Sequence, residues 1–403
     1  VMLTHKNIAQ NALHSVPRLP EREPGTEYRV LSFLPVCHIF ERMLHYLYMY
    51  EGANIHFGES LETVKDDLAA AKPHMFTAVP RLLEKFHDAI VAKGREAGGV
   101  KSAIFNWAVG LALAWEPDGR NGGFYEWKLG IARKLVFDKV KEALGLTQIM
   151  AVACGSAALA PRLARFFNGA GIPVYEGYGL TETSPVVSVN SLNSPDMLRI
   201  GTVGKLIEDT EVQIAEDGEI LVKGHQTMIG YYKDDEKTAE VMSDGWFHTG
   251  DIGVIEDGFL RITDRKKEMF KTSGGKYVAP QLLENAIKAS RLVEQVMVIG
   301  EGRKHPAALV VPDMTVLEEW CRRHDRPCPA AADVPDDQEI CDRIMEDIHG
   351  LMEPFASWER IKKIQVLPAA FSIDGGELTP TLKLKRKPIL AKYGHLIEAI
   401  YGA

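Results

Sequence analysis

The segment YEGYGLTETSP, at Tyr175–Pro185, combines residue types that suit a nucleotide ligand. Gly177 and Gly179 flank an aromatic residue at the end of a strand-like run. Glycine lets the backbone come close to a planar ligand or a phosphate, and the ring of Tyr178 can stack on a purine. The spacing therefore favours a site for a purine nucleotide.

Two more residues of this segment suit the phosphates of such a ligand. The Thr181 hydroxyl can hydrogen-bond a phosphate oxygen, and the Glu182 carboxylate is a hard oxygen ligand suitable for magnesium. The alternative is an ordinary turn between a strand and a helix, in which Thr181 caps the helix and Glu182 is solvated.

Two later segments strengthen the case for a nucleotide. FHTGD places Asp251 on a Gly-Asp turn, where a carboxylate can accept hydrogen bonds from both ribose hydroxyls, although such a sequence alone is more often just a turn. DRKKEMFKTSGGKYVAP joins a basic run to Gly274 and Gly275. A basic run is usually a solvated face or a nucleic-acid patch, but a glycine pair directly after it suits a mobile loop that covers a ligand.

Several cations cluster in LTPTLKLKRKP, at Leu378–Pro388. In one interpretation a lysine from this segment neutralises charge on a reacting carboxylate or phosphoryl group. The other interpretations are an edge strand protected by lysines and a nonspecific anion patch.

The elements that must position these residues alternate between strands and helices up to about residue 195. This alternation is typical of a largely parallel sheet covered by helices. Beyond Pro195, short strands separated by Gly and Asp turns predict a small, mostly antiparallel subdomain, and the charged stretch at Asp264 marks the start of a smaller lobe. The pattern predicts helices over 3–15, 40–50, 61–71, 281–290 and 339–352, and strands over 28–35, 53–57, 74–79, 149–154, 174–178, 296–299 and 307–311.

Composition narrows the class of protein. The 403 residues suffice for two or three domains, and the net charge of −8 argues against a general nucleic-acid binder. No apolar run is long enough to span a bilayer, and the first residues show no signal-peptide pattern. The five cysteines form no CxxC pair, so we expect reduced thiols in a cytoplasmic protein, with neither a zinc site nor a disulfide framework.

The chain resembles the adenylate-forming superfamily, which includes acyl-CoA synthetases, luciferases and peptide-synthetase adenylation domains. The resemblance is carried by four motifs that occur in the order of that superfamily: YGLTET, HTGD, DRKKE and SGGKYVAP. The resemblance covers nearly the whole chain, and LPVCHIFERM, GSAALAP and LTPTLKLKR look like the long-chain fatty acyl-CoA synthetase branch. It implies an α/β fold, in which a large α/β domain with a small β-barrel-like subdomain precedes a small, mobile α+β C-terminal domain. The expected parts are 1–195, 196–263 and 264–403.

The resemblance also implies which residues bind the nucleotide and perform the chemistry. Asp251 and Arg265 would bind the ribose hydroxyls. Thr181 would touch the α-phosphate, and Glu182 would hold magnesium. Lys383 would serve the adenylation step, with Lys385 as a rival because TLKLK offers two registers. The residues expected around the adenine are Gly155, Ser156, Ala157, Gly177, Tyr178 and Gly179.

A second group is implied on the acyl and CoA side. Lys267 would be the hinge of the C-terminal lobe, and Gly274, Gly275 and Lys276 would form the pantetheine passage after the lobe turns. His38 lies in a segment that borders the acyl and CoA side in relatives, whereas a lone histidine on an apolar run is more often a packed core residue.

The implied activity is ATP-dependent activation of a long-chain fatty acid to acyl-AMP and then to acyl-CoA, with release of pyrophosphate and AMP. ATP, Mg²⁺ and CoA are therefore expected, with small molecules and no nucleic acid as partners. Two alternatives stay open: a fatty acyl-AMP ligase that loads a carrier protein, and a non-catalytic fragment that binds a nucleotide or acyl-adenylate. Peripheral membrane association and a homodimer also stay open.

The first five residues carry one more implication. In this branch a Thr/Ser/Gly-rich phosphate loop ends in Lys-Gly and is commonly followed by residues like Val-Met-Leu-Thr-His. The chain opens with that sequence, so we expect it to begin just after the loop and to hold an incomplete large domain. ATP turnover by this chain alone is then in doubt.

Overall fold

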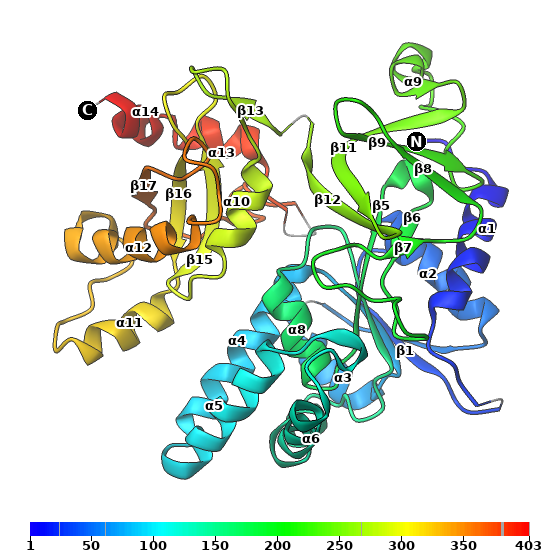
Figure 1. Ribbon diagram of the computed structural model, residues 1–403, viewed down its shortest axis with the longest axis horizontal. Helices are drawn as coiled ribbons and strands as arrows, with labels where there is room; N and C mark the ends of the chain where they lie inside the picture. The colour runs from blue at the N-terminus through cyan, green and yellow to red at the C-terminus, as the bar shows by residue number, and fades with distance from the viewer. Residues whose placement is uncertain (24, 61, 267, 380–382, 403) are drawn as a thin grey trace. The chain divides into compact units, whose positions relative to one another are not determined.

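The computed structural model describes all residues except 24, 61, 267, 380–382 and 403. The chain divides into two compact units (Figure 1), which are treated separately below. Unit 1 consists of Val1–Thr249 and Gly253–Ile262, and unit 2 consists of Gly250–Ile252 and Thr263–Ala403. Each unit has hydrophobic cores of its own. In the described part of the chain, no helix is both long enough and apolar enough to cross a bilayer.

Unit 1 begins with a parallel sheet in the strand order β2-β1-β3-β4-β5. Its strands are β1 (Arg29–Ser32), β2 (Asn54–Phe57), β3 (Met75–Ala78), β4 (Ala151–Cys154) and β5 (Val174–Gly179). The helices of this unit are α1 (His5–Ser15), α2 (Ile39–Tyr50), α3 (Val64–Ala71), α4 (Pro80–Glu96), α5 (Gly99–Leu113), α6 (Gly123–Ala132), α7 (Asp138–Ala143), α8 (Pro161–Gly169) and α9 (Asp235–Val241). The predicted alternation of strands and helices is confirmed for this sheet.

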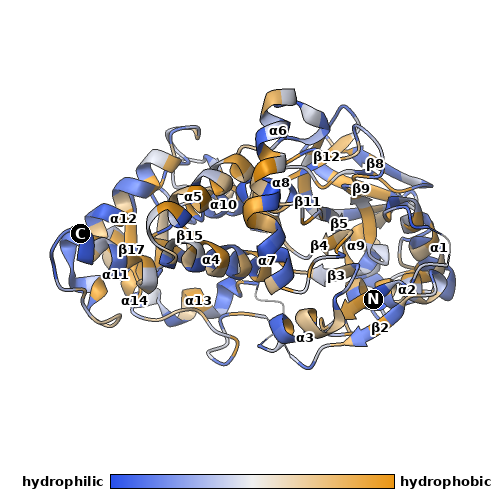
Figure 2. Ribbon diagram, turned by 90° about the horizontal axis from the view of Figure 1, so that it is seen from below, coloured by the Kyte–Doolittle hydropathy of each residue, from blue (hydrophilic) through white to orange (hydrophobic). Residues whose placement is uncertain are grey.

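Both faces of β1, β3 and β4 are largely buried, whereas the edge strand β2 is mostly exposed. Successive side chains of a strand point to opposite faces, so each inner strand contributes to two layers. Val30 and Met75 pack with apolar residues of α1 and α2, whereas their neighbours Leu31 and Phe76 pack with residues of α4, α5 and α8. The apolar residues of β1 and β3 therefore serve two cores (Figure 2 colours each residue by hydropathy).

The sheet continues without a break into antiparallel strands, in the order β5-β6-β7-β12-β11-β9-β8. These strands are β6 (Val186–Val189), β7 (Lys205–Leu206), β8 (Thr210–Ile214), β9 (Glu219–Gly224), β10 (Met242–Ser243), β11 (Trp246–Glu256) and β12 (Phe259–Arg265). The prediction of a barrel-like subdomain is wrong for the described residues. Because β6 pairs with β5, the later strands extend the first sheet and do not close on themselves.

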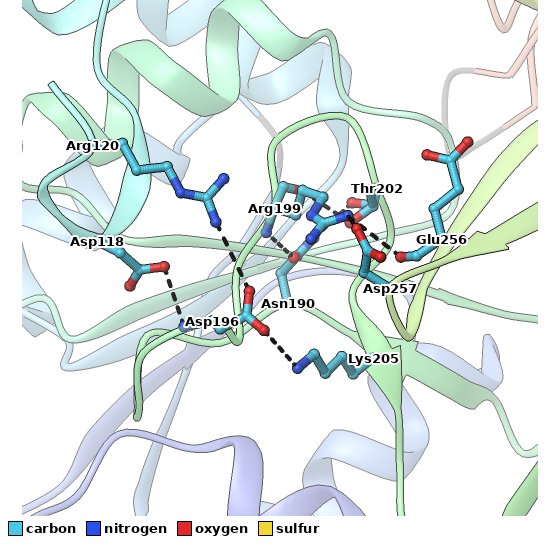
Figure 3. A network of polar contacts seen from close by, with 9 residues as sticks. All are labelled: Asp118, Arg120, Asn190, Asp196, Arg199, Thr202, Lys205, Glu256 and Asp257. Carbon is cyan, nitrogen blue, oxygen red and sulfur yellow. Dashed lines mark hydrogen bonds and ion pairs between the residues drawn. The ribbon is translucent and has the colours of Figure 1, made fainter.

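A polar network holds the segment between β6 and β7, within the antiparallel half of the sheet (Figure 3). The Asp196 carboxylate lies 3.2 Å from Lys205 Nζ, and the Asp196 N–H donates to Asp118. Arg199 donates to Asp257 at 3.0 Å, and its own N–H donates to Asn190 at 2.9 Å. This stretch is thus fixed at several points to its neighbours in unit 1.

Unit 2 contains a three-stranded sheet in the order β15-β16-β17, together with a short β13–β14 hairpin. Helices α10 and α12 pack on one face of the sheet, and α13 and α14 contribute to the core on the other. Its elements are β13 (Phe270–Lys271), β14 (Tyr277–Val278), β15 (Val293–Ile299), β16 (Ala307–Pro312), β17 (Lys363–Val366), α10 (Pro280–Ile287), α11 (Met314–Arg323), α12 (Gln338–Leu351), α13 (Arg386–Lys392) and α14 (Gly394–Gly402).

Candidate functional site

In unit 1 the structure brings two predicted nucleotide-binding segments together. β4 and β5 are parallel neighbours with Cys154 opposite Glu176, so their carboxyl ends meet at one edge of the sheet. Gly155, Ser156 and Ala157 follow β4 directly, whereas Gly177, Tyr178 and Gly179 complete β5. In an open α/β sheet, ligands bind at the carboxyl ends of parallel strands. These two segments therefore form the unit 1 part of the candidate site.

Glu176 connects these two segments, although no role is predicted for it from the sequence. Its side chain is buried, and its Oε1 accepts a hydrogen bond from the Leu159 N–H at 2.8 Å. Burial raises the pKa of the Glu176 carboxyl to about 8, although the Leu159 N–H lowers it. Glu176 therefore favours its protonated form, and the loop after β4 is held to β5 through it.

Replacing Glu176 with glutamine should change how stability depends on pH. A carboxyl whose pKa is raised on folding stabilises the fold below its unfolded pKa, and that stability is lost as pH rises towards 8. Glutamine still accepts the Leu159 N–H but does not ionise. We expect Glu176→Gln to unfold much as the native protein does at pH 4.5, and to be more stable by about 4 kcal/mol at pH 8. Urea unfolding across this pH range measures the difference, and identical pH profiles would contradict the assignment.

The chain reverses sharply after β5. A Cβ added to Gly179 would lie 1.8 Å from the Pro185 carbonyl oxygen, so only glycine fits there. Thr181 and Glu182 lie in a 3₁₀ turn, Thr181–Thr183, and the next element is β6. The alternative interpretation, in which Thr181 caps a following helix, is therefore wrong.

Glu182 has a partner, Tyr231, that lies far from it in the sequence. The Tyr231 hydroxyl donates to Glu182 Oε1 at 2.9 Å. Burial, and then the hydrogen bond to Glu182, raise the pKa of Tyr231 to about 12, so this hydroxyl stays a donor and orients the carboxylate. No group of three or more metal-ligating side chains occurs among the described residues. One carboxylate is nevertheless a donor set that fits Mg²⁺, because this ion commonly takes its other ligands from phosphates and water.

In unit 2 the two predicted ribose-binding residues form an ion pair. Asp251 lies on β11 with its side chain buried, and Arg265 ends β12. Arg265 Nε lies 3.2 Å from Asp251 Oδ1, and the guanidinium is partly exposed. A carboxylate held in this way still has lone pairs that can accept hydrogen bonds from a pair of hydroxyls.

Lys383 belongs to the same group of charges. The Thr379 N–H donates to the Lys383 carbonyl at 2.8 Å, and Leu378 pairs with Leu384. Burial lowers the pKa of the Lys383 amine and Arg265 lowers it further, whereas Asp251 and Glu268 raise it. By contrast, the side chain of Lys385 is exposed. Lys383 is thus the lysine that shares surroundings with Asp251 and Arg265.

Two sets of contacts, each made to a buried carboxylate, fix the ends of the Lys383 segment. At its start, Glu377 forms an ion pair with Lys392 and accepts a hydrogen bond from Ser372 N–H at 3.1 Å. At its end, Arg386 donates to Glu284 at 2.5 Å and to the Val298 carbonyl at 2.9 Å. Neither contact is predicted from the sequence, and those of Arg386 join residues far apart in the chain.

The remaining predicted residues are placed as follows. Lys267 lies outside the described residues. Gly274, Gly275 and Lys276 form the turn between β13 and β14, and Lys276 Nζ lies 5.1 Å from the centre of the Trp358 ring. His38 precedes α2 and is exposed, so it is not a packed core residue.

The surroundings of His38 link it to the unit 1 segments. Phe40, two residues further on, lies close to Gly155: a Cβ added to Gly155 would be 3.4 Å from the Phe40 ring.

The predicted nucleotide-binding residues are divided between the two units. Tyr178 and Glu182 belong to unit 1, whereas Asp251 and Arg265 belong to unit 2. Their convergence on one nucleotide therefore stays a prediction.

Comparison with protein-family models gives two matches. Residues 1–232 match the model described as AMP-binding enzyme, and residues 268–403 match the model described as AMP-binding enzyme C-terminal domain. Among solved structures, the A domain of carboxylic acid reductase from Segniliparus rugosus, in complex with AMP and a co-purified carboxylic acid, has a TM-score of 0.74 at 22% identity. That similarity covers 100% of this chain and 59% of the other, and it shows a shared fold.

Two curated relatives have higher sequence identity. The chain is 37% identical to the long-chain-fatty-acid–CoA ligase FadD15 of Mycobacterium bovis, over 93% of this chain and 62% of that protein. It is 34% identical to the long-chain-fatty-acid–CoA ligase 5 of Rattus norvegicus, over 99% of this chain and 60% of that protein. The chain therefore spans about three fifths of the length of these relatives.

Proposed function

Because this chain belongs to the family of AMP-binding enzymes, we propose that it activates a long-chain fatty acid as acyl-AMP and transfers the acyl group to CoA. The names of the relatives, which are long-chain-fatty-acid–CoA ligases, support the choice of substrates. The observation that carries the proposal is the group formed by Lys383, Asp251 and Arg265 in unit 2. It combines a partly buried amine with a carboxylate suited to a ribose.

In the first step, a fatty carboxylate oxygen attacks the α-phosphorus of ATP and pyrophosphate leaves. Negative charges are crowded together in this reaction, so cationic groups and hydrogen-bond donors lower its barrier. Lys383 supplies an ammonium group, and the Thr181 hydroxyl donates to an α-phosphate oxygen. Asp251 accepts hydrogen bonds from the ribose hydroxyls and fixes the nucleotide.

Glu182 would hold the magnesium ion, with Tyr231 keeping its carboxylate in place. When bound, Mg²⁺ would neutralise charge on the phosphate oxygens. Gly155–Ala157 and Gly177–Gly179 would present backbone to the adenine, since neither segment has bulky side chains apart from Tyr178.

In the second step, the CoA sulfur attacks the acyl carbonyl of acyl-AMP, and AMP leaves with the electron pair of the broken acyl–phosphate bond. This step does not need the cation that promotes adenylation. We assign the Gly274–Lys276 turn and the segment of His38 to the side where CoA and the acyl chain bind. Lys267 stays the proposed hinge between the two steps.

Two assays on the purified chain test this function. The first supplies ATP, Mg²⁺ and palmitate, with and without CoA, and measures AMP, pyrophosphate and palmitoyl-CoA. The second supplies palmitoyl-AMP and CoA directly, so that only thioester formation is measured. We expect palmitoyl-CoA in the second assay, and CoA-dependent release of AMP in the first. Transfer to an acyl carrier protein without transfer to CoA would contradict the choice of acceptor. Tight binding of an acyl-AMP analogue without turnover in either assay would contradict catalysis.

A further inference from the structure

Helix α5 has two apolar stripes, and only one of them is buried. Phe105, Ala108 and Ala112 are buried in the core of unit 1. Val100, Ile104 and Trp107 follow the same helical spacing along another side, where they are exposed; Val100 is 77% exposed and Trp107 40%. A water-facing side of a helix normally carries charged residues, but the exposed residues of this helix include one charge, Lys101.

Helix α6 packs against α5 and has an exposed apolar stripe of its own. Phe124 is 70% exposed and Trp127 is 62% exposed, and their rings stack with centres 5.9 Å apart. Leu135, in the π-helical turn Arg133–Phe137 that follows, is also exposed. We call the exposed residues of the two helices the α5–α6 face: Val100, Ile104, Trp107, Phe124, Trp127 and Leu135 (α5 and α6 are labelled in Figures 1 and 2).

The charges beside this face are mainly positive. α5, α6 and the π-helical turn contain four cationic residues and one carboxylate, whereas the whole chain has a net charge of −8. Lys128 Nζ lies 4.3 Å from the centre of the Phe124 ring, so the cation borders the aromatic stack directly. Lys134 is exposed next to Leu135. The face thus combines aromatic rings with cations at its edge.

We propose that the α5–α6 face binds the surface of a bilayer that contains anionic lipids. Tryptophan and phenylalanine beside lysine suit the boundary between headgroups and acyl chains, where the rings are buried and the ammonium groups meet phosphates. A dimer formed through the same face would bring Lys128 and Lys134 of one copy towards the same cations of the other, because a two-fold interface pairs a patch with itself. Charge complementarity therefore favours an anionic lipid surface over a second copy.

The test measures how the full chain binds vesicles. Vesicles of phosphatidylcholine mixed with phosphatidylglycerol are compared with vesicles of phosphatidylcholine alone, and the bound fraction is determined by flotation. We expect binding to the mixed vesicles that weakens as salt is raised. The Phe124→Ser/Trp127→Ser variant should bind at least tenfold more weakly. Lys128→Gln/Lys134→Gln should lose roughly fivefold per lysine on mixed vesicles. Tyr50→Ser, which removes a 65% exposed aromatic from the end of α2, should bind like the native chain.

Three results would overturn the proposal. The first is equal vesicle binding by the native chain and the aromatic double variant. The second is no vesicle binding together with a dimer, seen by sedimentation, that the double variant abolishes; the face would then join two copies. The third is no vesicle binding and no dimer. Far-ultraviolet circular dichroism confirms that each variant is folded. Because lipid binding is measured without substrate, its failure is distinguishable from failure of the proposed acyl activation.

Discussion

Replacing Lys383 with alanine should slow acyl-AMP formation by roughly two to three orders of magnitude, while thioester formation from supplied acyl-AMP changes by no more than about twofold. The amine is partly buried and shares its surroundings with Asp251 and Arg265, two residues that we assign to the nucleotide. Its removal should cost about 3 kcal/mol of electrostatic stabilisation in the adenylation step. Rates of pyrophosphate release and of thioester formation, measured on one preparation, give the two values.

The matched control for this substitution is Lys385→Ala. Lys385 has the same charge and lies two residues away, but its side chain is exposed. We expect this variant to keep nearly native rates in both steps. An equal loss in both steps for Lys383→Ala, or a larger loss for Lys385→Ala, would assign the adenylation role elsewhere.

Local signals in the sequence predict the elements around the unit 1 site well. The helix predicted over 3–15 is α1, and Thr4 caps it, with its hydroxyl accepting the Asn7 N–H at 3.1 Å. The strands predicted over 149–154 and 174–178 are β4 and β5. These elements are recognisable because an N-cap, a buried apolar run and a terminal glycine are each encoded within a few residues.

Features that depend on distant residues could not be predicted in this way. The barrel-like subdomain is a wrong prediction because the pairing of β6 with β5 is a property of the sheet, and turn residues alone do not specify it. No helix is predicted over 80–143. Part of the reason is that α5 is apolar on two sides, so a pattern with one buried stripe does not describe it.

The residues of the candidate site divide in the same way, into those that local motifs predict and those that depend on distant parts of the chain. The residues named from the motifs in unit 1 lie at neighbouring strand ends, as a shared site requires, and Lys383 has Asp251 and Arg265 as electrostatic neighbours. Their supporting partners, Glu176, Tyr231 and Arg386, are not predicted. A single acid, tyrosine or arginine has no local pattern that distinguishes a buried, bonded side chain from a solvated one.

The second large effect is expected at Arg386. Its side chain is mostly buried and holds the carboxylates of Glu284 and Glu268, with Nε 3.4 Å from Glu268 Oε2. Breaking a buried ion pair by removing one partner leaves an uncompensated charge, which typically costs about 3–5 kcal/mol. We therefore expect Arg386→Met to destabilise unit 2 by an amount of that order, measured by urea unfolding. Arg386→Met/Glu284→Gln should recover much of the loss, because it removes the stranded charge as well.

The stability lost in Arg386→Met should be larger at high pH than at low pH. Burial raises the pKa of Glu284, and Arg386 lowers it, so Arg386→Met should raise this pKa further. Stability held by a group with a raised pKa is present at low pH and is lost as pH rises, so the variant should be closest to the native protein near pH 5 and furthest from it near pH 8. A constant difference across this range would show that packing, and not the stranded charge, causes the loss.

The catalytic consequence of Arg386→Met follows from its place in the chain. Arg386 begins α13 three residues after Lys383, and it fixes that point to α10 through Glu284 and to the end of β15 through the Val298 carbonyl. Without it, the Lys383 segment loses its attachment to α10 and to β15, so the amine is less closely held beside Asp251. We expect adenylation to fall by roughly tenfold or more at a pH where the variant is folded, with thioester formation less affected. Arg386→Lys, which keeps the charge but not the three-way hydrogen bonding, should lie between the native protein and the methionine variant in both stability and adenylation rate.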